Sequence, residues 1–452
     1  MFDEYINNKK PSILFITHNK AGGTERCVME MAFTWEKKGW SVFIVRPYGN
    51  ILKMYNLNWD NKISLNFVIP NEYEAFINIC KIFGVKLIHY HHLIGYPEYI
   101  CELSKKLRCK YYITLHDYFC ICPRINLMRE EKYCEEKECN KCISLYFNKK
   151  DIIDIDDWRN KWNIFLRNAE KITVPSKDTL FRIKRYFSDL NIYIVENPEI
   201  HKSYINSNLS NKPPKVLKIG ILGNISKSKG ADLLYECSRY AEKMNLPIKY
   251  IVIGTTYKKT KGFFNNKLKI TGAYVDKNLL DIIKKEDIDI FFFPTKIPET
   301  FSYTLSATIL AKRPSVVFNI GAIAERVKKY QIGWCIPLEF DAVDINKFFA
   351  KYNYYWKIYK EKEKAFQYIK LKDKYEMKDY YSKDFIYLKN NFNVNLKLAI
   401  KYIEEYKKVY KENFIKKIIR WILKRKDLYL FEKISDYLTE KQKDIIKKLL
   451  NI

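Results

Sequence analysis

The 452-residue chain contains little glycine and proline, with 14 residues of each. That scarcity excludes collagen-like and low-complexity chains, and the 47% of hydrophobic residues excludes a disordered one. No uninterrupted apolar run reaches the roughly 18–20 residues of a membrane-spanning helix, and the first ten residues lack the apolar stretch of a secretory signal. We therefore expect two or three globular domains, located in the cytoplasm with most cysteines reduced.

Several familiar ligand signals are also missing. The strand-to-helix turns carry neither G-x-G-x-x-G nor the Lys-Ser/Thr of a P-loop. Two Asp-x-Asp matches, Asp154–Asp156 and Asp287–Asp289, lie outside the context expected for a metal–nucleotide signal. No nucleic-acid recognition motif accompanies the formal charge of +29, so we expect no nucleic-acid partner.

The positive charge is dispersed but denser near the C-terminus, where the last 102 residues hold 27 Lys or Arg against 14 Asp or Glu. Within them, residues 413–426 read NFIKKIIRWILKRK. On a helix, this segment places an apolar face around Trp421 and a basic face around Arg420, a pattern that suits an anionic membrane surface. The alternative is a helix packed on the domains with its lysines in water.

Short apolar runs alternate with amphipathic stretches such as Glu25–Lys38, which predicts an α/β protein with doubly wound parallel sheets. The polar segment 201–214 interrupts this alternation, and from about residue 345 the pattern is helical. We predict domains at 1–205, with a cysteine-rich insertion at 118–145, and at 206–375, followed by a basic helical tail at 376–452. The predicted strands are Ser12–Thr17, Ser41–Arg46, Leu65–Ile69, Lys86–His91, Tyr111–Leu115, Lys171–Val174, Ile192–Val195, Lys215–Leu222, Ile248–Gly254, Leu268–Gly272, Ile288–Pro294, Ser315–Phe318 and Gly333–Pro337.

Glycine turns follow the first strand of each predicted domain. Gly22 and Gly23 lie between a strand and a helix, where glycine allows close backbone approach to a ligand and a helix N-terminus favours an anion. Gly223 opens a similar turn that contains Lys227 and Lys229, which favours a diphosphate site. The alternatives are a tight turn without a ligand and lysines that are simply solvated.

Two further strand ends carry polar groups. After the strand IDIFFFP comes Glu299 and then Thr300, Phe301 and Ser302, where a carboxylate and helix N-terminal amides could hold sugar hydroxyls or phosphate oxygens. Hydroxyl residues at such positions are more often helix caps. His116 follows another strand and could donate a hydrogen bond to a ligand, while a purely structural histidine is the alternative.

Five of the 11 cysteines fall within 23 residues, and four of these could complete a structural zinc site. The pair Cys139-x2-Cys142 has the spacing of a zinc knuckle, and Cys122 and Cys134 are the other two candidates. A catalytic zinc is not expected, because four thiolates leave no open coordination position. Free or packed thiols in a reducing compartment are the alternative.

The ordered series HNKAGGTER, LHDY, VPSKDT, ENP, GNISKSKG and PETFSYTLS resembles family 4 glycosyltransferases of the GT-B fold over roughly residues 10–340. The stretch HDYFCICPRINLM is similar to a subgroup linked to bacterial surface polysaccharide synthesis (lipopolysaccharide, O-antigen or capsule). The resemblance implies two Rossmann-like domains facing across a cleft and a retaining, metal-independent transfer of a sugar from a nucleotide sugar to a glycan or lipid-linked glycan. Catalysis would then need no cofactor.

The resemblance also implies roles for single residues. Lys229 matches the lysine that contacts the donor diphosphate, with Lys227 assisting it. Glu299 matches the first glutamate of an E-x7-E motif and contacts the donor sugar. His116 matches the histidine that contacts the transferred sugar.

The remaining donor-binding residues follow from the same family motifs. Gly22 and Gly23 match a first-domain loop that faces the donor, and Gly223 opens the diphosphate turn. The amides of Phe301 and Ser302, in the stretch that starts at Thr300, lie near sugar and phosphate oxygens in the family.

One departure from the family pattern is Ala307, which stands where the second glutamate of E-x7-E accepts hydrogen bonds from the nucleotide ribose. Its loss is expected to weaken donor binding by about 1.5–3 kcal/mol. Two other functions remain open, a degenerate GT-B module that binds a glycan or partner without catalysis, and a sugar-nucleotide epimerase. The expected location is the cytoplasm, including the inner face of the plasma membrane through residues 413–426.

Overall fold

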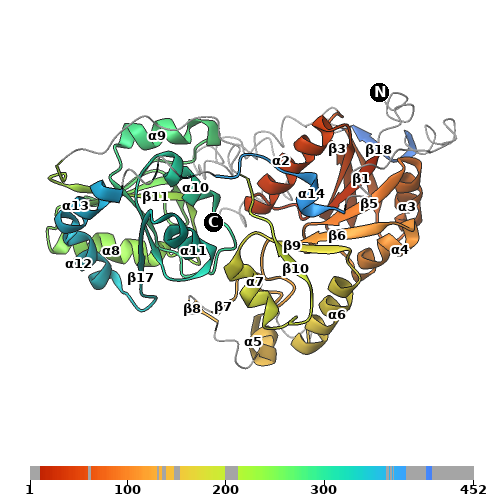
Figure 1. Cartoon of the computed structure of the whole chain (residues 1–452), viewed down its shortest axis with the longest axis horizontal. Coiled ribbons are helices and arrows are strands. Elements are labelled where there is room, and N and C mark those ends of the chain that lie inside the picture. The colour runs from red at the N-terminus through yellow and green to blue at the C-terminus, as the bar shows by residue number, and fades with distance from the viewer. Residues whose placement is uncertain are drawn as a thin grey trace, which may run out of the picture.

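The computed structural model describes residues 11–59, 63–129, 132–134, 139–146, 153–198, 212–362, 366, 369, 371–382 and 404–409. They form two α/β domains side by side, the first drawn in red to yellow and the second mainly in green to cyan (Figure 1). The predicted fold class is confirmed, since each domain is built on a mainly parallel sheet. In the described part of the chain, no helix is long and apolar enough to cross a membrane.

The first domain contains a nine-stranded sheet in the order β10-β9-β6-β5-β1-β2-β3-β4-β18. Neighbours from β10 through β2 pair in parallel, whereas β3, β4 and β18 add antiparallel pairs at the other edge. The strands are β1 (Ser12–Ile16), β2 (Ser41–Tyr48), β3 (Ile51–Asn56), β4 (Ile63–Val68), β5 (Val85–Tyr90), β6 (Lys110–Thr114), β9 (Lys171–Val174), β10 (Ile192–Ile194) and β18 (Lys407–Val409). Strand β3 was not predicted, because its side chains alternate between buried and partly buried positions instead of forming an apolar run.

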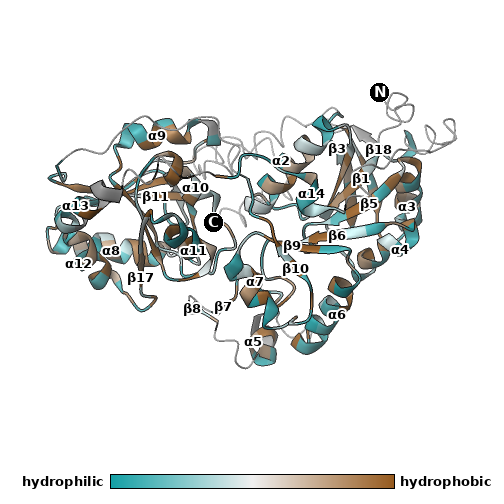
Figure 2. Cartoon of the chain, in the orientation of Figure 1, coloured by the Kyte–Doolittle hydropathy of each residue, from teal (hydrophilic) through white to brown (hydrophobic). Residues whose placement is uncertain are grey.

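Helices of this domain surround the sheet, with one exception in the cysteine-rich insertion. They are α2 (Gly23–Lys37), α3 (Tyr73–Ile82), α4 (Leu103–Leu107), α5 (Cys139–Tyr146), α6 (Ile155–Arg167) and α7 (Lys177–Lys184), with a 3-10 helix η1 at Glu98–Glu102. The exception is α5, which lies beside α6. In α2 the buried residues Val28, Met31 and Trp35 recur at helical spacing and pack against the strands. Figure 2 shows the resulting division, with brown strands in the interior and teal patches on the outer helices.

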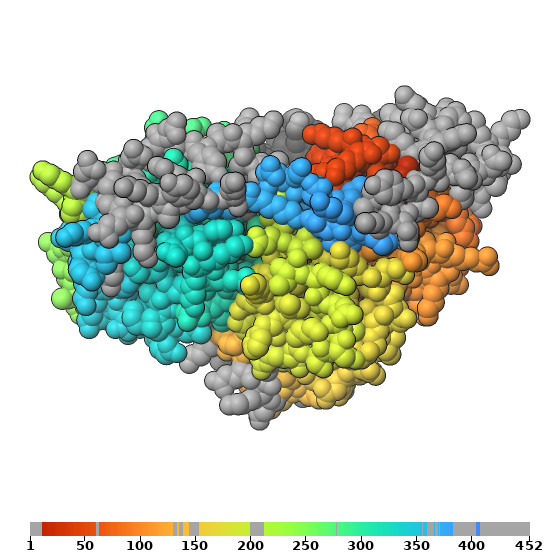
Figure 3. Space-filling view, viewed as in Figure 1, coloured from red at the N-terminus to blue at the C-terminus, as the bar shows by residue number. Residues whose placement is uncertain are grey.

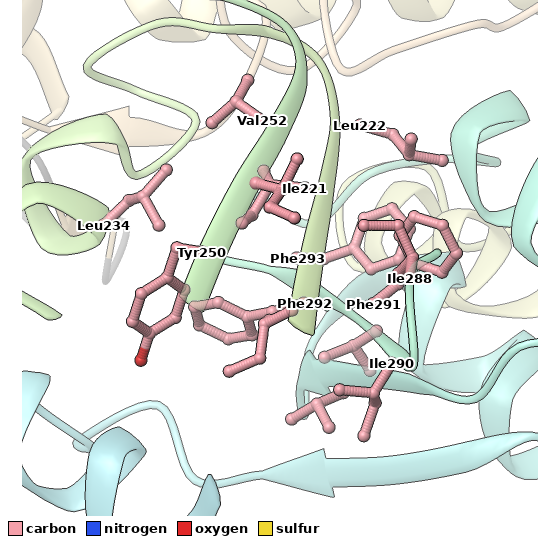
Figure 4. Packing of buried hydrophobic residues seen from close by; sticks show 14 of the residues in the cluster. Ile221, Leu222, Leu234, Tyr250, Val252, Ile288, Ile290, Phe291, Phe292 and Phe293 are labelled. Carbon is pink, nitrogen blue, oxygen red and sulfur yellow. The ribbon is translucent and has the colours of Figure 1, made fainter. Parts of the chain in front are cut away.

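The second domain contains a seven-stranded sheet in the order β13-β14-β12-β11-β15-β16-β17, in which only β13 runs antiparallel. The strands are β11 (Leu217–Ile225), β12 (Ile248–Thr256), β13 (Gly262–Asn265), β14 (Leu268–Ile270), β15 (Ile290–Phe293), β16 (Ser315–Phe318) and β17 (Gly333–Ile336). Their inner side chains, among them Ile221, Val252 and Phe292, form a continuous buried cluster (Figure 4). This cluster fixes the register of the strands whose carboxyl ends carry the predicted motifs.

The helices of the second domain are α8 (Ala231–Lys243), α9 (Leu279–Glu286), α10 (Tyr303–Leu310), α11 (Gly321–Tyr330), α12 (Ala342–Ala350) and α13 (Tyr352–Lys362), with η2 at Asp276–Asn278. The chain then returns to the first domain through α14 (Met377–Tyr380). There the Trp35 indole N–H donates to the Tyr381 hydroxyl over 3.1 Å, and that hydroxyl lies 2.7 Å from His89 Nδ1. Tyr375, Met377, Tyr380 and Tyr381 therefore belong to the first domain's core.

The two domains touch through α7 and α11. The backbone N–H groups of Lys177 and Asp178, at the start of α7, donate to the Glu325 carboxylate over 3.3 and 2.8 Å. A helix N-terminus favours such an anion. An ion pair of 2.5 Å between Lys329 and Glu196 adds a second link. In Figure 3 teal residues of the second domain meet the yellow-green residues around α7.

The predicted domain boundaries stay a prediction. Beyond residue 375 the described residues contain α14 and also the strand β18, although a helical tail was expected. The basic segment 413–426 lies outside the described residues.

Candidate functional site

The loop after β15 carries Glu299 to the junction of the two domains. The side chain of Glu299 is half-buried, and in the described part of the chain its carboxylate has no hydrogen-bond or ion-pair partner. Its backbone is held by α11, where the Ala322 N–H donates to the Glu299 carbonyl over 2.7 Å. Gly321 permits this contact, because a Cβ there would lie 2.7 Å from the Glu299 nitrogen. The carboxylate is thus held in place by its backbone and free to bind a ligand.

The next residue, Thr300, joins the domains directly. Its hydroxyl donates to the backbone carbonyl of His116 over 2.6 Å. The predicted sugar-contacting loop and the predicted sugar-contacting histidine, joined by residues 184 positions apart in the chain, are therefore adjacent in space.

Arg326 shapes the start of α10. Its guanidinium donates to the carbonyls of Phe301 and Ser302, over 3.3 and 2.9 Å, and lies over the Phe301 ring. Ser302 adopts a left-handed conformation with φ of 74°, which turns the chain into the helix. The first N–H groups of α10 have no intrahelical acceptor by the nature of a helix start, and the helix dipole favours an anion at this end.

The first-domain glycine loop faces this helix start. Gly22 and Gly23 are exposed, and a Cβ at Gly23 would stand 3.6 Å from the Tyr303 ring. The Arg26 guanidinium lies 4.3 Å from the centre of the same ring. The loop and the start of α10 therefore lie close together across the domain junction.

The turn between β11 and α8 brings the two predicted lysines to the same junction. Gly223, with φ of 107°, lies near the side chain of Thr304 on α10. Lys227 lies 3.8 Å from Asp232, whereas the exposed Lys229 ammonium has no partner in the described residues. Gly230 allows the turn to pack closely against the end of β15. Any other residue would place its Cβ 2.1 Å from the Pro294 carbonyl oxygen, which is too close. Lys229 is the lysine here that can meet an added anion without breaking an existing ion pair.

Five of the six histidines gather at the carboxyl ends of β1, β5 and β6, and sequence reasoning had singled out only His116. His91 Nδ1 lies 3.0 Å from His116 Nε2, and His92 Nε2 lies 2.9 Å from the Asp117 carboxylate. The His18 ring packs against His92, and the His89 ring stacks on His91. The signal that could have found them is His18 directly after the first strand and HYHH at the end of a neighbouring one, because parallel strands meet at the same sheet edge.

Burial lowers the pKa of four of these histidines, His18, His89, His91 and His116. Desolvation is the largest cause that lowers the pKa of His116 to about 3, with the neighbouring His92 and His18 adding to it. Desolvation and His92 likewise lower the pKa of His18 to about 4. Burial works to raise the pKa of Asp117, but His92 and the Phe119 N–H outweigh it, so that pKa is lowered. At neutral pH the imidazoles of His18 and His116 are therefore neutral and lie near the Asp117 carboxylate.

A large cavity opens next to the histidines on the first domain, with a volume of about 1110 Å³. Aromatic rings from three segments line much of it, including Tyr99, Trp158 and Trp162. Phe119 also lies in its wall and stacks on the His92 ring at 4.9 Å between centres. Only the Phe119 ring would therefore separate a ligand in the cavity from His92.

The two Asp-x-Asp matches have local structural roles. Asp154 caps α6 by accepting from the backbone N–H groups of Asp156 and Asp157. Asp289 accepts from the Lys218 N–H at the amino end of β11, opposite the strand ends that carry the motifs. Neither pair lies with the candidate residues.

Ala307 is 4% exposed and belongs to the buried cluster of the second domain. A glutamate at position 307 would have its Cβ among buried apolar side chains. The missing second glutamate is thus replaced by a residue that packs the core.

The four candidate zinc ligands line one small cavity of about 20 Å³. Cys120, the fifth member of the sequence cluster, is buried instead in the first domain's hydrophobic core. The structure therefore brings the predicted ligands together and separates the other cysteine from them.

No protein-family model and no curated protein matches the chain. Solved structures do resemble it in fold. Sucrose-phosphate synthase from Thermosynechococcus elongatus has a TM-score of 0.52 at 13% identity, over 79% of this chain and 94% of that one. A glycosyltransferase from Rickettsia africae has a TM-score of 0.51 at 16% identity, over 89% and 100%.

Anabaena HepE, solved with UDP-glucose, has a TM-score of 0.50 at 13% identity, over 87% of this chain and 98% of that one. At such identities the likeness concerns fold and not activity. Together with the two sheets and their order, these comparisons show that the chain has the GT-B fold.

Proposed function

We propose that the protein is a retaining glycosyltransferase that moves a sugar from a nucleotide-sugar donor to a glycan or lipid-linked glycan in bacterial surface polysaccharide synthesis. The observation that carries the proposal is the meeting of the Glu299–Thr300 loop, His116 and the Gly22–Gly23 loop at one domain junction, with the Lys229 turn beside the start of α10. Its fold neighbours support it, because they include a sucrose-phosphate synthase and a HepE structure with UDP-glucose.

The proposed chemistry breaks the bond between the sugar's anomeric carbon and the diphosphate oxygen, which keeps the electron pair. The acceptor hydroxyl forms the new bond on the same face and gives its proton to the departing phosphate. Lys229, with Lys227 nearby, stabilises the negative charge that develops on the diphosphate, together with the N–H groups at the start of α10. We propose that this charge is neutralised without a metal.

The sugar would lie between Glu299 and His116. The free carboxylate accepts hydrogen bonds from sugar hydroxyls, and fixed partners of this kind hold the reacting carbon in position. His116 is neutral because burial lowers its pKa to about 3, so it serves as a hydrogen-bonding group and not as a cation.

We propose that the acceptor binds on the first domain, in the cavity of about 1110 Å³. Its aromatic walls suit either the apolar faces of sugar rings or a lipid chain. Phe119 links the cavity to His92 and so to the proposed sugar position.

The decisive experiment is a thermal-shift panel of UDP, GDP, ADP, CMP and their sugars on the full chain. Stabilisation by one nucleotide and its sugar supports the transferase and identifies the donor's base. Folded protein that responds to none of them favours the non-catalytic module. Conversion of a sugar nucleotide into its epimer without an acceptor favours the epimerase.

The Glu299→Gln variant separates binding from chemistry. It removes the carboxylate but keeps the side chain's size, so the donor-induced thermal shift should persist while transfer falls by about 10²-fold. Unchanged transfer would remove Glu299 from the proposed mechanism.

For residues 413–426 we propose contact with an anionic membrane surface, on sequence grounds alone. Flotation with liposomes should require anionic lipid and should be lost when residues 413–452 are deleted. Binding that depends on neither would exclude this anchor.

A further inference from the structure

The cysteine-rich insertion forms a small closed unit beside α6 and α7. A hairpin of β7 (Met128–Arg129) and β8 (Lys132–Tyr133) folds back, and the Cys134 N–H donates to the Leu127 carbonyl over 2.8 Å. Ile125 and Leu127 both adopt left-handed conformations, with φ of 69° and 53°, which are uncommon for bulky residues. These two backbone turns reverse the chain direction, so that Cys134 lies near Cys122.

Helix α5 supplies the second pair of sulfur atoms. Cys139 and Cys142 are three residues apart and so lie on the same helix face. With Cys122 and Cys134, they line one cavity of about 20 Å³, which can hold a single ion and is too small for an organic ligand. The other walls are mainly apolar, among them Ile121 and Ile143.

Two arginines point at these sulfur atoms. Arg124 Nη1 donates to Cys142 Sγ over 2.9 Å, and Arg159 Nη2 donates to Cys139 Sγ over 3.6 Å. Both guanidiniums are largely shielded from solvent. Arg159 also pairs with Asp156 over 3.8 Å, and thiolates at the four cysteines would bring further negative charge to both guanidiniums.

We propose that Cys122, Cys134, Cys139 and Cys142 bind one Zn²⁺ in a structural site with four thiolates. Each thiol gives its proton to solvent and forms one Zn–S bond. The complete site carries two negative charges, which the two arginines offset. Four sulfur ligands leave no position for substrate, so the ion takes no part in sugar transfer.

The sulfur atoms must close in when the ion binds. In the described part of the chain, no group of three or more His, Cys, Asp or Glu side chains is already arranged as a metal site. The hairpin and the short helix α5 are small elements, and the binding energy of zinc is large enough to order such units.

The site would hold an interdomain contact in place. Tyr133 directly precedes Cys134 and packs against the hydrophobic clusters of both domains. Arg182 of α7 donates to the Tyr133 hydroxyl and lies over its ring. Figure 1 shows this hairpin near α7, below the boundary between the domains. Zinc bound to Cys134 therefore fixes the residue through which the insertion reaches the second domain.

Metal analysis of the full chain, purified without chelators, tests the proposal. We expect about one zinc per chain. Less than about 0.2 zinc per chain, or iron in its place, would overturn it. Disulfide bonds among the four cysteines in protein purified under reducing conditions would also overturn it.

Variants identify the ligands. Cys139→Ser and Cys142→Ser should each reduce the zinc content at least about tenfold, whereas the control Cys335→Ser, in the second domain, should keep it. If the serine variants do not fold, zinc release from the wild type on thiol modification, followed with a metal-binding dye, replaces them. Zinc that stays bound after Cys122, Cys134, Cys139 and Cys142 have all been modified would exclude thiolate ligands.

The result is independent of the proposed enzymatic function. A zinc-bearing chain that ignores every nucleotide would refute the transferase and leave the metal site standing. A chain that binds a nucleotide but contains no zinc would refute the metal site and leave the transferase proposal intact.

Discussion

The two domains present opposite kinds of chemistry at their junction. The first domain contributes buried, neutral histidines, with His18 and His116 only 8% and 9% exposed. The second contributes the exposed Lys229 and the half-buried, unpartnered Glu299 carboxylate. The contrast suggests that the second domain attracts a charged ligand, whereas the first recognises uncharged hydroxyl groups by position.

Removing the free lysine should have the largest effect. Lys229→Ala takes away the cation next to the proposed diphosphate and should lower kcat/KM for transfer by about 10²–10³-fold. Lys249→Ala, an exposed lysine on β12, is the matched control and should leave it unchanged. Equal effects of the two variants would show that only the overall positive charge matters.

Placing a charge in the buried part of the second domain should be the next most damaging change. Ala307→Glu introduces a carboxylate into the core cluster and should lower the free energy of unfolding by about 3 kcal/mol. Urea unfolding measures this cost, with Ala307→Gln as the uncharged control. If the glutamate instead tightens nucleotide binding without that loss, position 307 faces the ligand as the family motif implies.

The buried histidines should make stability depend on pH. Because the folded-state pKa of His116 is about 3, against 6.5 for an ordinary histidine, the unfolded chain binds more protons between these values. Stability is therefore fully present above about pH 6.5 and is lost as pH falls, by about 1.4 kcal/mol per pH unit for each such histidine.

Between pH 6.5 and 5, His116 alone should then account for about 2 kcal/mol. Urea unfolding at these two values measures the loss, and His116→Gln should reduce its slope whatever its effect on stability at pH 7. An identical slope in the variant would mean that His116 is not desolvated.

The smallest predicted effect concerns the hydrogen bond between the two domains that Thr300 forms with His116. Thr300→Val removes the hydrogen bond to the His116 carbonyl and should cost about 1 kcal/mol of stability. Thr300→Ser keeps a hydroxyl and should restore most of it. A larger loss of donor affinity than of stability would indicate that Thr300 also touches the donor.

Much of the fold followed from the sequence, because a parallel strand covered on both faces must be a short apolar run. Predicted strands such as Lys171–Val174 and Ser315–Phe318 coincide with β9 and β16. The antiparallel strands β3 and β13 were missed, since β3 leaves every second side chain partly exposed and β13 lies at the edge of its sheet.

The sequence by itself determined two α/β domains and the residue types at their strand ends, because hydrophobic periodicity and turn chemistry are local properties. Only the tertiary structure decided which of those residues meet. Thr300 reaches His116, five histidines converge from three strands, and Arg326 from α11 shapes the start of α10. These contacts join segments far apart in the chain, so their partners depend on strand order and domain packing, which no local pattern encodes.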